Sequence, residues 1–346
     1  MRKSPTIIDV ASFAGVSKST VSNVLQGKSN VDADLRLRVL DAIESMGYQV
    51  HAGARFMRQP SRVIGVVVGD LANPFHAVLA AEVEEQCAAK GYSIVLASTG
   101  GVPERDVVRI RTLLEHRVAA LIFLSEPSQA ALSLVRNTVP TVFLGGAGNH
   151  SVSVTVDNAA GTRLAVEHLA GLGHRKIGFV SAMLADEPEL ESQRYQGYAE
   201  GLANAALPLE PSQLLREHGK RRSLQRTYRD RIRRYLDRPD RATAVIAALD
   251  MLALEIITVA DELAIRIPQD LSLVGFDDIP IASHNRIALT TIAQPMQALA
   301  GRAVDAAIDS VMESTLNHEK VVMFTPGLIV RSSTSRPAEA APSTKF

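Results

Sequence analysis

Cysteine is almost absent from this 346-residue chain, which contains only Cys87. A single thiol excludes a disulfide framework and a thiolate metal cluster, and it predicts a reducing, cytoplasmic setting. Long apolar runs are missing as well, since the longest, residues 118–124, is far short of the roughly 20 residues that span a bilayer. The polar first residues lead into a helical pattern without an apolar segment, so we expect neither an export signal nor contact with a membrane.

Net charge is also lacking, but the charges are unevenly distributed. Residues 1–62 carry nine basic and five acidic side chains, so this segment is about +4 and the remainder about −4. A small basic module on an acidic body favours contact with a polyanion. The length and the apolar fraction of 46% allow two or three packed domains.

The first fifty residues show the pattern of three short helices. Thr6 is a suitable N-cap with an acidic residue three positions later, and Gly15 allows a tight turn before Ser17, which caps a second helix over 18–25. Asp32 is expected to cap a third helix. Its predicted inward-facing stripe is Leu35, Val39, Leu40, Ile43 and Met46. Two helices joined by a short glycine turn form a helix-turn-helix, whose second helix enters the major groove of DNA.

The exposed face of the second helix is predicted to be small, polar or basic. It comprises Lys18, Ser19, Thr20, Ser22 and Asn23. This composition favours DNA binding, and the alternative is a three-helix bundle used only for protein contacts.

The segments TIIDVASFAGVSKSTVSNVLQGKSNV and LRVLDAIESMGY resemble the head of the lactose/galactose repressor (LacI/GalR) family. The resemblance implies that Lys18, Ser19 and Asn23 contact bases. Asn23 stands where the family commonly has Arg, and Asn suits adenine rather than guanine. The other DNA contacts implied here, mainly to the DNA backbone, are Thr6, Ser17, Thr20, Ser22 and Asn30.

Residues 50–61 resemble the family's hinge, a short helix that folds only on DNA and inserts a leucine into the minor groove. This chain keeps Ala54 but has Gly53 within the expected helix and Met57 in place of leucine. Because Gly weakens a helix interior, we expect folding of this hinge to be coupled to DNA binding. Ala54 and Met57 are therefore predicted DNA contacts; the alternative is that Met57 is a linker residue packed on the body.

From residue 62 onward, apolar and β-branched runs alternate with helical patterns. Strands are predicted over residues 63–68, 92–96, 119–124, 141–144, 176–180, 244–248 and 271–275. Helices are predicted over residues 77–90, 104–116, 128–135, 158–172, 193–204, 223–236 and 251–263. The predicted fold is an all-α helix-turn-helix head on an α/β body with two lobes, each a doubly wound parallel sheet.

The body resembles the same family in segments such as VTVDNAAGTRLAVEHLAGLGHRKIGFV, and that family's body resembles periplasmic sugar-binding proteins. The resemblance implies chain crossings between lobes near residues 160, 290 and 324. The expected division is a head (1–49), a hinge (50–61), an N-terminal lobe (62–160 and 293–323), a C-terminal lobe (161–292 and 324–336) and a tail (337–346).

Ligands of doubly wound sheets bind beyond the carboxyl ends of the strands. Asn73, Phe75 and His76 follow the first predicted strand, and Phe75 and His76 match positions that pack against ligands in the family. Arg194 and Asp277 match its ligand-binding arginine and aspartate. The alternatives are that His76 is a surface helix-capping residue and that Arg194 is a surface charge.

Several pocket positions depart from the family pattern. Gly145 and Gly146 replace a polar pair, Leu249 replaces an asparagine, and Pro188 stands in a loop that often supplies a polar contact. The resemblance implies a sugar or sugar derivative as effector, and these departures leave room for a smaller or less hydroxylated ligand. The basic stretch 216–241 is predicted to be a solvated face, the alternative being a site for an anionic effector or partner.

The expected function is a DNA-binding regulator, most simply a repressor, that binds operator DNA as a homodimer or higher oligomer and responds to a small-molecule effector. The alternatives are a solute-binding protein and a regulator of a non-sugar metabolite. An enzyme is not expected, because no phosphate-binding glycine loop occurs and Cys87 has no evident histidine partner. We expect no cofactor and no metal: Asp277 and Asp278 alone make a poor metal site.

Overall fold

The computed structural model describes residues 5–25, 28, 31–46, 61–136, 138–145, 152–184, 188–219, 221–312 and 320–338. The chain divides into two compact units, Met1–Ser61 and Arg62–Phe346. The predicted DNA contacts Asn30, Ala54 and Met57 lie outside the described residues.

The described residues of the first unit form three helices, α1 (Ile7–Ala14), α2 (Lys18–Leu25) and α3 (Ala33–Met46). Their local signals act as predicted. Thr6 and Asp9 form a reciprocal capping box, Gly15 adopts a φ of 64°, and Ser17 Oγ accepts the Thr20 N–H at 3.1 Å. Asp32 Oδ1 likewise accepts the N–H groups of the first turn of α3.

This unit has a small apolar core. The prediction that Leu40 belongs to the inward-facing stripe of α3 is wrong. The buried core residues are Val10, Ala11, Ala14, Val21, Val24, Val39 and Ala42. Leu40 is 48% exposed. It lies about 100° around the helix from Val39, whereas Ala42 and Ile43 lie closer to the direction of Val39. The stripe is therefore narrower than predicted.

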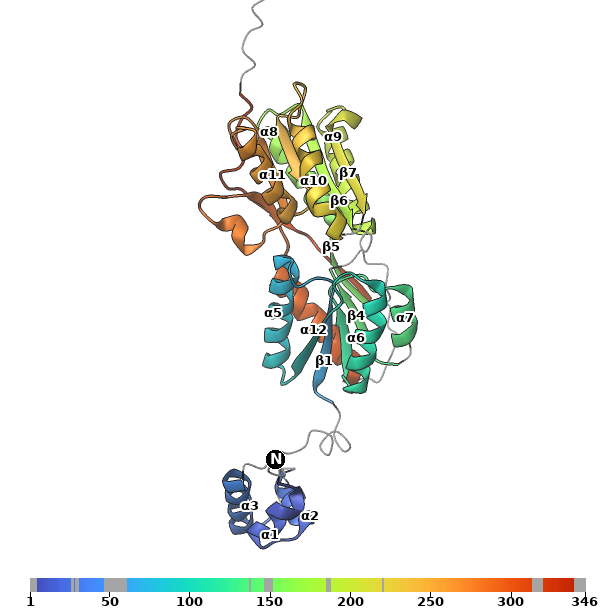
Figure 1. The fold of residues 1–346 in the computed structure, drawn as a ribbon, viewed down its shortest axis with the longest axis vertical. Coiled ribbons are helices and arrows are strands. Elements are labelled where there is room, and N and C mark those ends of the chain that lie inside the picture. Colours follow the sequence, from blue (N-terminus) through green and yellow to red (C-terminus); the bar gives the residue numbers. More distant parts are fainter. Residues whose placement is uncertain are drawn as a thin grey trace, which may run out of the picture. The chain divides into compact units, whose positions relative to one another are not determined.

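The second unit contains two six-stranded sheets, which we call sheet A and sheet B (Figure 1). Sheet A has the order β11 (Lys320–Phe324), β5 (Val152–Val156), β4 (Thr141–Leu144), β3 (Ala120–Phe123), β1 (Val63–Val68) and β2 (Ser93–Ser98). Sheet B has the order β12 (Gly327–Ile329), β10 (Thr290–Ala293), β9 (Ser272–Asp277), β8 (Ala244–Ala247), β6 (Ile177–Leu184) and β7 (Leu214–Gly219). All neighbours pair in parallel except β12, which is antiparallel to β10.

Helices cover both faces of each sheet, as a parallel sheet requires. On sheet A, α5 (Pro74–Ala89) and α12 (Met296–Met312) pack together, while α6 (Pro103–Glu115) and α7 (Gln129–Val135) cover the other face (Figure 1). On sheet B, α8 (Asn158–Gly171) packs with α9 (Pro188–Asn204), and α10 (Arg221–Leu236) with α11 (Asp250–Glu262). Side chains of β1 alternate between the two cores, with Val66 and Val68 in one and Val67 in the other.

The chain changes sheet three times. It leaves sheet A after β5, leaves sheet B after β10, and returns to sheet B between β11 and β12. The predicted helices and strands are all present, with ends shifted by a few residues. Strands β5, β7, β10, β11 and β12 and helix α12 are additional to the predicted set.

Candidate functional site

Both sheets reverse their winding at an equivalent point. In sheet A, β1 lies between β2 and β3, and in sheet B, β6 lies between β7 and β8. Ligands of doubly wound sheets bind beyond the strand ends at this reversal. The helices that follow β1 and β6 are α5 and α9. They carry the predicted ligand residues Asn73–His76 and Arg194.

The three predicted residues after β1 are all buried, and two of them have structural contacts. Asn73 is the N-cap of α5, and its Oδ1 accepts the Phe75 N–H at 3.1 Å. His76 is 7% exposed, and its Nδ1 lies 3.1 Å from the carbonyl oxygen of Asp70. The interpretation of His76 as a surface residue is therefore wrong. Phe75 lies in the apolar core, with its ring 5.5 Å from that of His76.

Arg194 is 3% exposed, so it is not a surface charge. Its Nε donates to Asn158 Oδ1 at 3.0 Å, and one terminal nitrogen donates to the carbonyl oxygen of Ala248. The guanidinium carbon lies 3.7 Å from the ring centroid of Phe276, a cation–π contact. Helix α9 thus holds this cation against the ends of β8 and β9.

Asp277 is the last residue of β9 and faces Arg194. The two predicted effector residues contact each other: an Arg194 terminal nitrogen lies 3.5 Å from Asp277 Oδ1. The same oxygen accepts the side-chain amide of Gln294 at 2.8 Å. The ion pair is longer than the hydrogen bond from Arg194 to Asn158 (3.0 Å) and the one from Gln294 to Asp277 (2.8 Å).

Asn158, Gln294 and Asp250 belong to this cluster and were not predicted as site residues. Asn158 begins α8, where the chain leaves sheet A, and Gln294 follows β10, where it leaves sheet B. Asp250 begins α11 and accepts Thr291 Oγ1 at 2.6 Å and the Ile279 N–H at 2.9 Å. Each is a polar residue directly after a buried strand or at a helix start, a signal present in the sequence.

Asp250 has an unusual environment for a carboxyl group. It is fully buried. Burial and the nearby charge of Asp277 raise its pKa from 3.8 to about 7, although the hydrogen bonds from Thr291 and Ile279 act in the opposite direction. Asp278, in contrast, pairs with Arg331 at 2.7 Å on the half-exposed side of the turn.

The positions that depart from the family pattern lie at ends of strands and helices. Gly145 follows β4 with a φ of 84°, and a side chain added there would meet only Leu79, 4.0 Å away. Leu249 is the N-cap of α11 and makes no side-chain cap hydrogen bond. Pro188 is the first residue of α9, so its placement in a loop is wrong. Gly146 lies outside the described residues.

The predicted DNA-reading face of α2 is exposed at two of its three predicted base-contacting residues. Lys18 and Ser19 are exposed, and Thr20, Ser22 and Asn23 are half-buried. Ser17 Oγ lies 2.7 Å from Ser19 Oγ and 2.9 Å from Thr20 Oγ1, so hydroxyl groups cluster at the helix start. Thr6 differs, because its hydroxyl is engaged in the capping box with Asp9.

Part of the basic stretch 216–241 is ion-paired. Arg229 lies 2.8 Å from Glu255, and Arg233 pairs with Glu262, which connects α10 to α11. These arginines remain about two-fifths exposed, in agreement with a solvated face. Among the described residues, no helix is long and apolar enough to cross a bilayer, and no group of acidic, histidine or cysteine side chains could hold a metal.

Comparisons with known proteins agree with both units. The family model for the periplasmic binding protein-like domain matches residues 166–334, and that for bacterial regulatory proteins of the lacI family matches residues 6–50. The HTH-type transcriptional repressor PurR of Haemophilus influenzae (strain PittEE) is 31% identical over 340 residues, or 95% of this chain and 98% of the relative.

Two solved structures show the same likeness. The crystal structure of the Lac repressor dimer bound to operator and the anti-inducer ONPF matches with a TM-score of 0.82 and 27% identity, covering 96% of this chain and all of that one. The complex of the transcriptional regulator CelR with cellobiose matches with a TM-score of 0.68 and 25% identity, over 95% and 99% of the two chains.

The helix-turn-helix head and the two-sheet body define a DNA-binding transcriptional regulator with an effector-binding domain, not an enzyme. The chain belongs to the lacI family of bacterial regulatory proteins.

Proposed function

We propose that this protein is a cytoplasmic repressor that binds operator DNA as a homodimer and is controlled by a sugar or sugar derivative. The Lac repressor of known structure is a dimer on its operator, which supports the homodimer and the binding of operator DNA. Two heads would bind the halves of a pseudo-palindromic site. An effector can act only through its different affinities for two arrangements of the body, typically a coupling of about 1–3 kcal/mol.

The observation that carries the effector site is the buried pair of Arg194 and Asp277. A charged pair that is 3–4% exposed at the strand ends is costly to bury and is often retained for function. At 3.5 Å their contact is longer than the hydrogen bond from Arg194 to Asn158 and the one from Gln294 to Asp277. A hydroxylated ligand could donate to Asp277 and accept from Arg194.

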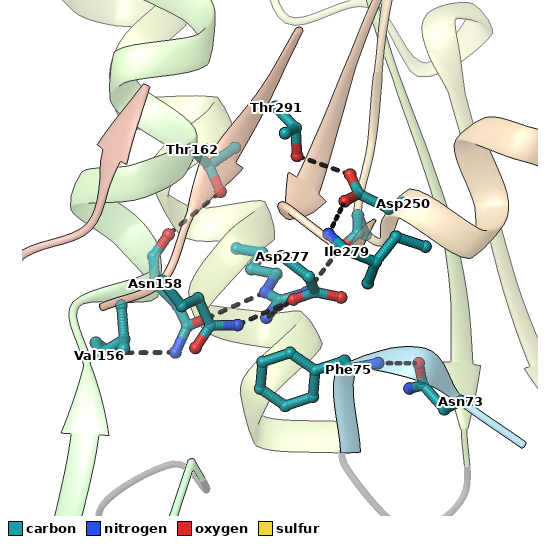
Figure 2. Close-up of polar contacts among 12 residues, drawn as sticks. Asn73, Phe75, Val156, Asn158, Thr162, Asp250, Asp277, Ile279 and Thr291 are labelled. Atoms are coloured by element: carbon teal, nitrogen blue, oxygen red, sulfur yellow. Dashed lines mark hydrogen bonds and ion pairs between the residues drawn. The ribbon is translucent and has the colours of Figure 1, made fainter. Parts of the chain in front are cut away.

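The proposed division follows the three chain crossings: a head (1–49), a hinge (50–61), an N-terminal lobe (62–160 and 293–323), a C-terminal lobe (161–292 and 324–336) and a tail (337–346). The proposed effector contacts are Asn73, Phe75, His76, Arg194 and Asp277. Asn73 caps α5 and Phe75 lies in its first turn, and both are drawn in the same close-up as Asp277 (Figure 2).

A thermal-shift screen of the full-length protein tests this site against sugars, sugar acids, polyols, nucleosides and amino acids. A ligand at 100 times its dissociation constant should add about 2.7 kcal/mol of stability. We expect the shift to be lost in Arg194→Met and Asp277→Asn. The matched control is Asp278→Asn, which removes a carboxylate one residue away that pairs with Arg331. A shift that persists in both site variants would place the ligand elsewhere.

Selection of bound duplexes from a random DNA library tests the head. The proposed base contacts are Lys18, Ser19 and Asn23; the other proposed DNA contacts are Thr6, Ser17, Thr20, Ser22, Asn30, Ala54 and Met57. We expect Asn23→Arg to change the preferred base at one position of each half-site toward guanine. Ser22→Ala should weaken binding to all sequences equally. An unchanged motif in Asn23→Arg would refute its role in base reading.

The hinge is tested separately with Met57→Ala on the selected operator. We expect binding to weaken by more than tenfold, since a small side chain cannot act as a minor-groove wedge. Effector binding should remain intact. An unchanged operator affinity would make Met57 a plain linker residue.

A further inference from the structure

The turn that carries Asp277 has an unusual backbone. Asp277 has a φ of 117° and Asp278 a φ of 55°, although neither is glycine. Two adjacent non-glycine residues with positive φ persist only where surrounding contacts hold them. The position of the Asp277 carboxylate therefore depends on whatever fixes residues 277–279.

The side chain of Asp250 fixes this turn from the start of α11. Its Oδ2 accepts the N–H of Ile279 at 2.9 Å, and its Oδ1 accepts the hydroxyl of Thr291 at 2.6 Å (Figure 2). One carboxyl group thus joins the turn after β9 to the neighbouring strand β10. It is fully buried while making both contacts.

Gly275 makes room for this arrangement. A Cβ at Gly275 would overlap Asp250 Oδ1, so the carboxyl group lies directly against the backbone of β9. The contact is two residues before Asp277. Asp250 therefore contacts the backbone two residues before and two residues after Asp277, the residue that we assign to effector binding.

We propose that Asp250 is the positioning residue for Asp277 and that the protonation state of Asp250 makes the effector site sensitive to pH. The proposal rests on the proposed role of Asp277 in effector binding. Asp250 itself is not assigned as an effector contact, because its two oxygens face Ile279 and Thr291.

The charges around Asp250 favour a bound proton. From the end of β9 it faces the carboxylates Asp277 and Asp278; the side chain that it meets from β10 is the uncharged Thr291. Arg194 on α9 pairs with Asp277, and Arg331 pairs with Asp278. In the described part of the chain no basic side chain pairs with Asp250. Burial and the charge of Asp277 then raise its pKa to about 7.

Both charge states of Asp250 can be hydrogen-bonded without moving the chain. The ionised carboxylate accepts from Thr291 and Ile279. The neutral acid can donate its proton to Thr291 Oγ1 while Oδ2 still accepts from Ile279. Loss of the proton therefore leaves the contacts in place but adds a negative charge beside Asp277, which changes the affinity of Asp277 for a ligand.

Titration of the full-length protein, with carbon-13 in the aspartate side-chain carboxyl groups, tests the proposal by NMR without any effector. We expect one signal to titrate within about one pH unit of 7, to be absent in Asp250→Asn, and to be accompanied by a shift of the Asp277 signal. The Asp277 signal is assigned with Asp277→Asn. In Asp250→Asn, which mimics the neutral acid, the Asp277 signal should no longer change near pH 7.

Two results would overturn the proposal. In the first, the signal that is lost in Asp250→Asn titrates below about pH 5.5. In the second, it titrates near pH 7 but the Asp277 signal does not shift with it. If Asp250→Asn does not fold, Thr291→Val and Thr291→Ser test the proposal instead. Thr291→Val removes a donor to the ionised form and should raise the midpoint by about one pH unit, whereas Thr291→Ser should restore it. An unchanged midpoint in Thr291→Val would contradict the geometry. A failure to find an effector would refute the proposed function. The titration of Asp250 could still be measured, because the NMR experiment uses no effector.

Discussion

Replacement of Arg194 by methionine is the sharpest test of how the buried cluster is held together. Methionine keeps much of the length and apolar bulk of arginine but cannot donate to Asn158, Ala248 or Asp277. Asp277 is 4% exposed; it would lose its ion pair and keep the hydrogen bond from the side-chain amide of Gln294. Removal of one partner of a buried pair typically costs about 3–5 kcal/mol, because the remaining charge stays buried. We expect a loss of about that size.

The double variant with Asp277→Asn separates charge from packing. If the loss arises from an unbalanced carboxylate, Arg194→Met with Asp277→Asn should be more stable than Arg194→Met alone. The free energy of unfolding would be measured in urea, at one protein concentration because oligomers are stabilised by concentration. Arg331→Met is the control. The pair of Arg331 with Asp278 is more exposed, so Arg331→Met should lower the free energy of unfolding by only about 1 kcal/mol. Equal losses in the two single variants, or no recovery in the double variant, would refute the reasoning.

Three further predictions concern a helix cap, a thiol and a carboxyl group. Thr6→Ala removes the capping box of α1 and should cost the head about 1 kcal/mol in its own unfolding transition; a smaller loss in Thr6→Ser would confirm the cap. Burial and Glu84 raise the pKa of Cys87 to about 11, so iodoacetamide at pH 8 should label it only after denaturation; rapid labelling of the folded protein would contradict its burial. The pKa of Asp250 is about 7 when folded and about 3.9 when unfolded, so the free energy of unfolding should fall by about 3 kcal/mol as the pH rises from 4 to 7, and Asp250→Asn should lack this part of the pH dependence.

The strands that could be predicted are those with strong local patterns. Continuous β-branched and apolar residues gave β1 and β4 their predicted bounds, because strands buried on both faces need apolar residues throughout. Helix α2 also has its predicted bounds, set by the Ser17 cap. Helix α5 begins three residues earlier than predicted, since Asn73 caps it and Pro74 occupies its first position.

The strands that escaped prediction are mostly at sheet edges or reached by a late return of the chain. Strand β7 (Leu214–Gly219) is a polar edge strand, and β11 and β12 join their sheets after long excursions. Val321 and Met323 of β11 are exposed, so its sequence lacks the continuous burial of a central strand. Pairing over such separations is decided by topology and leaves little local pattern in the sequence.

The residues of the proposed effector site were likewise predicted only in part. Arg194 and Asp277 were predicted, and the structure places them in contact. Their burial, the stacking of Arg194 on Phe276 and the roles of Asn158 and Gln294 depend on residues brought together from α8, α9, β9 and the segment after β10. The capping role of Asn73 could have been inferred from the Pro74 that follows it.

The measurement that tests the central claim most directly is operator binding with and without the effector found by thermal shift. Fluorescence anisotropy of the full-length protein on its selected duplex would be compared with that of Asp277→Asn at fixed salt. We predict that the effector changes the operator affinity of the unaltered protein by about 5- to 150-fold, and that Asp277→Asn binds the operator equally well but no longer responds. An effector response that survives in Asp277→Asn would contradict the account.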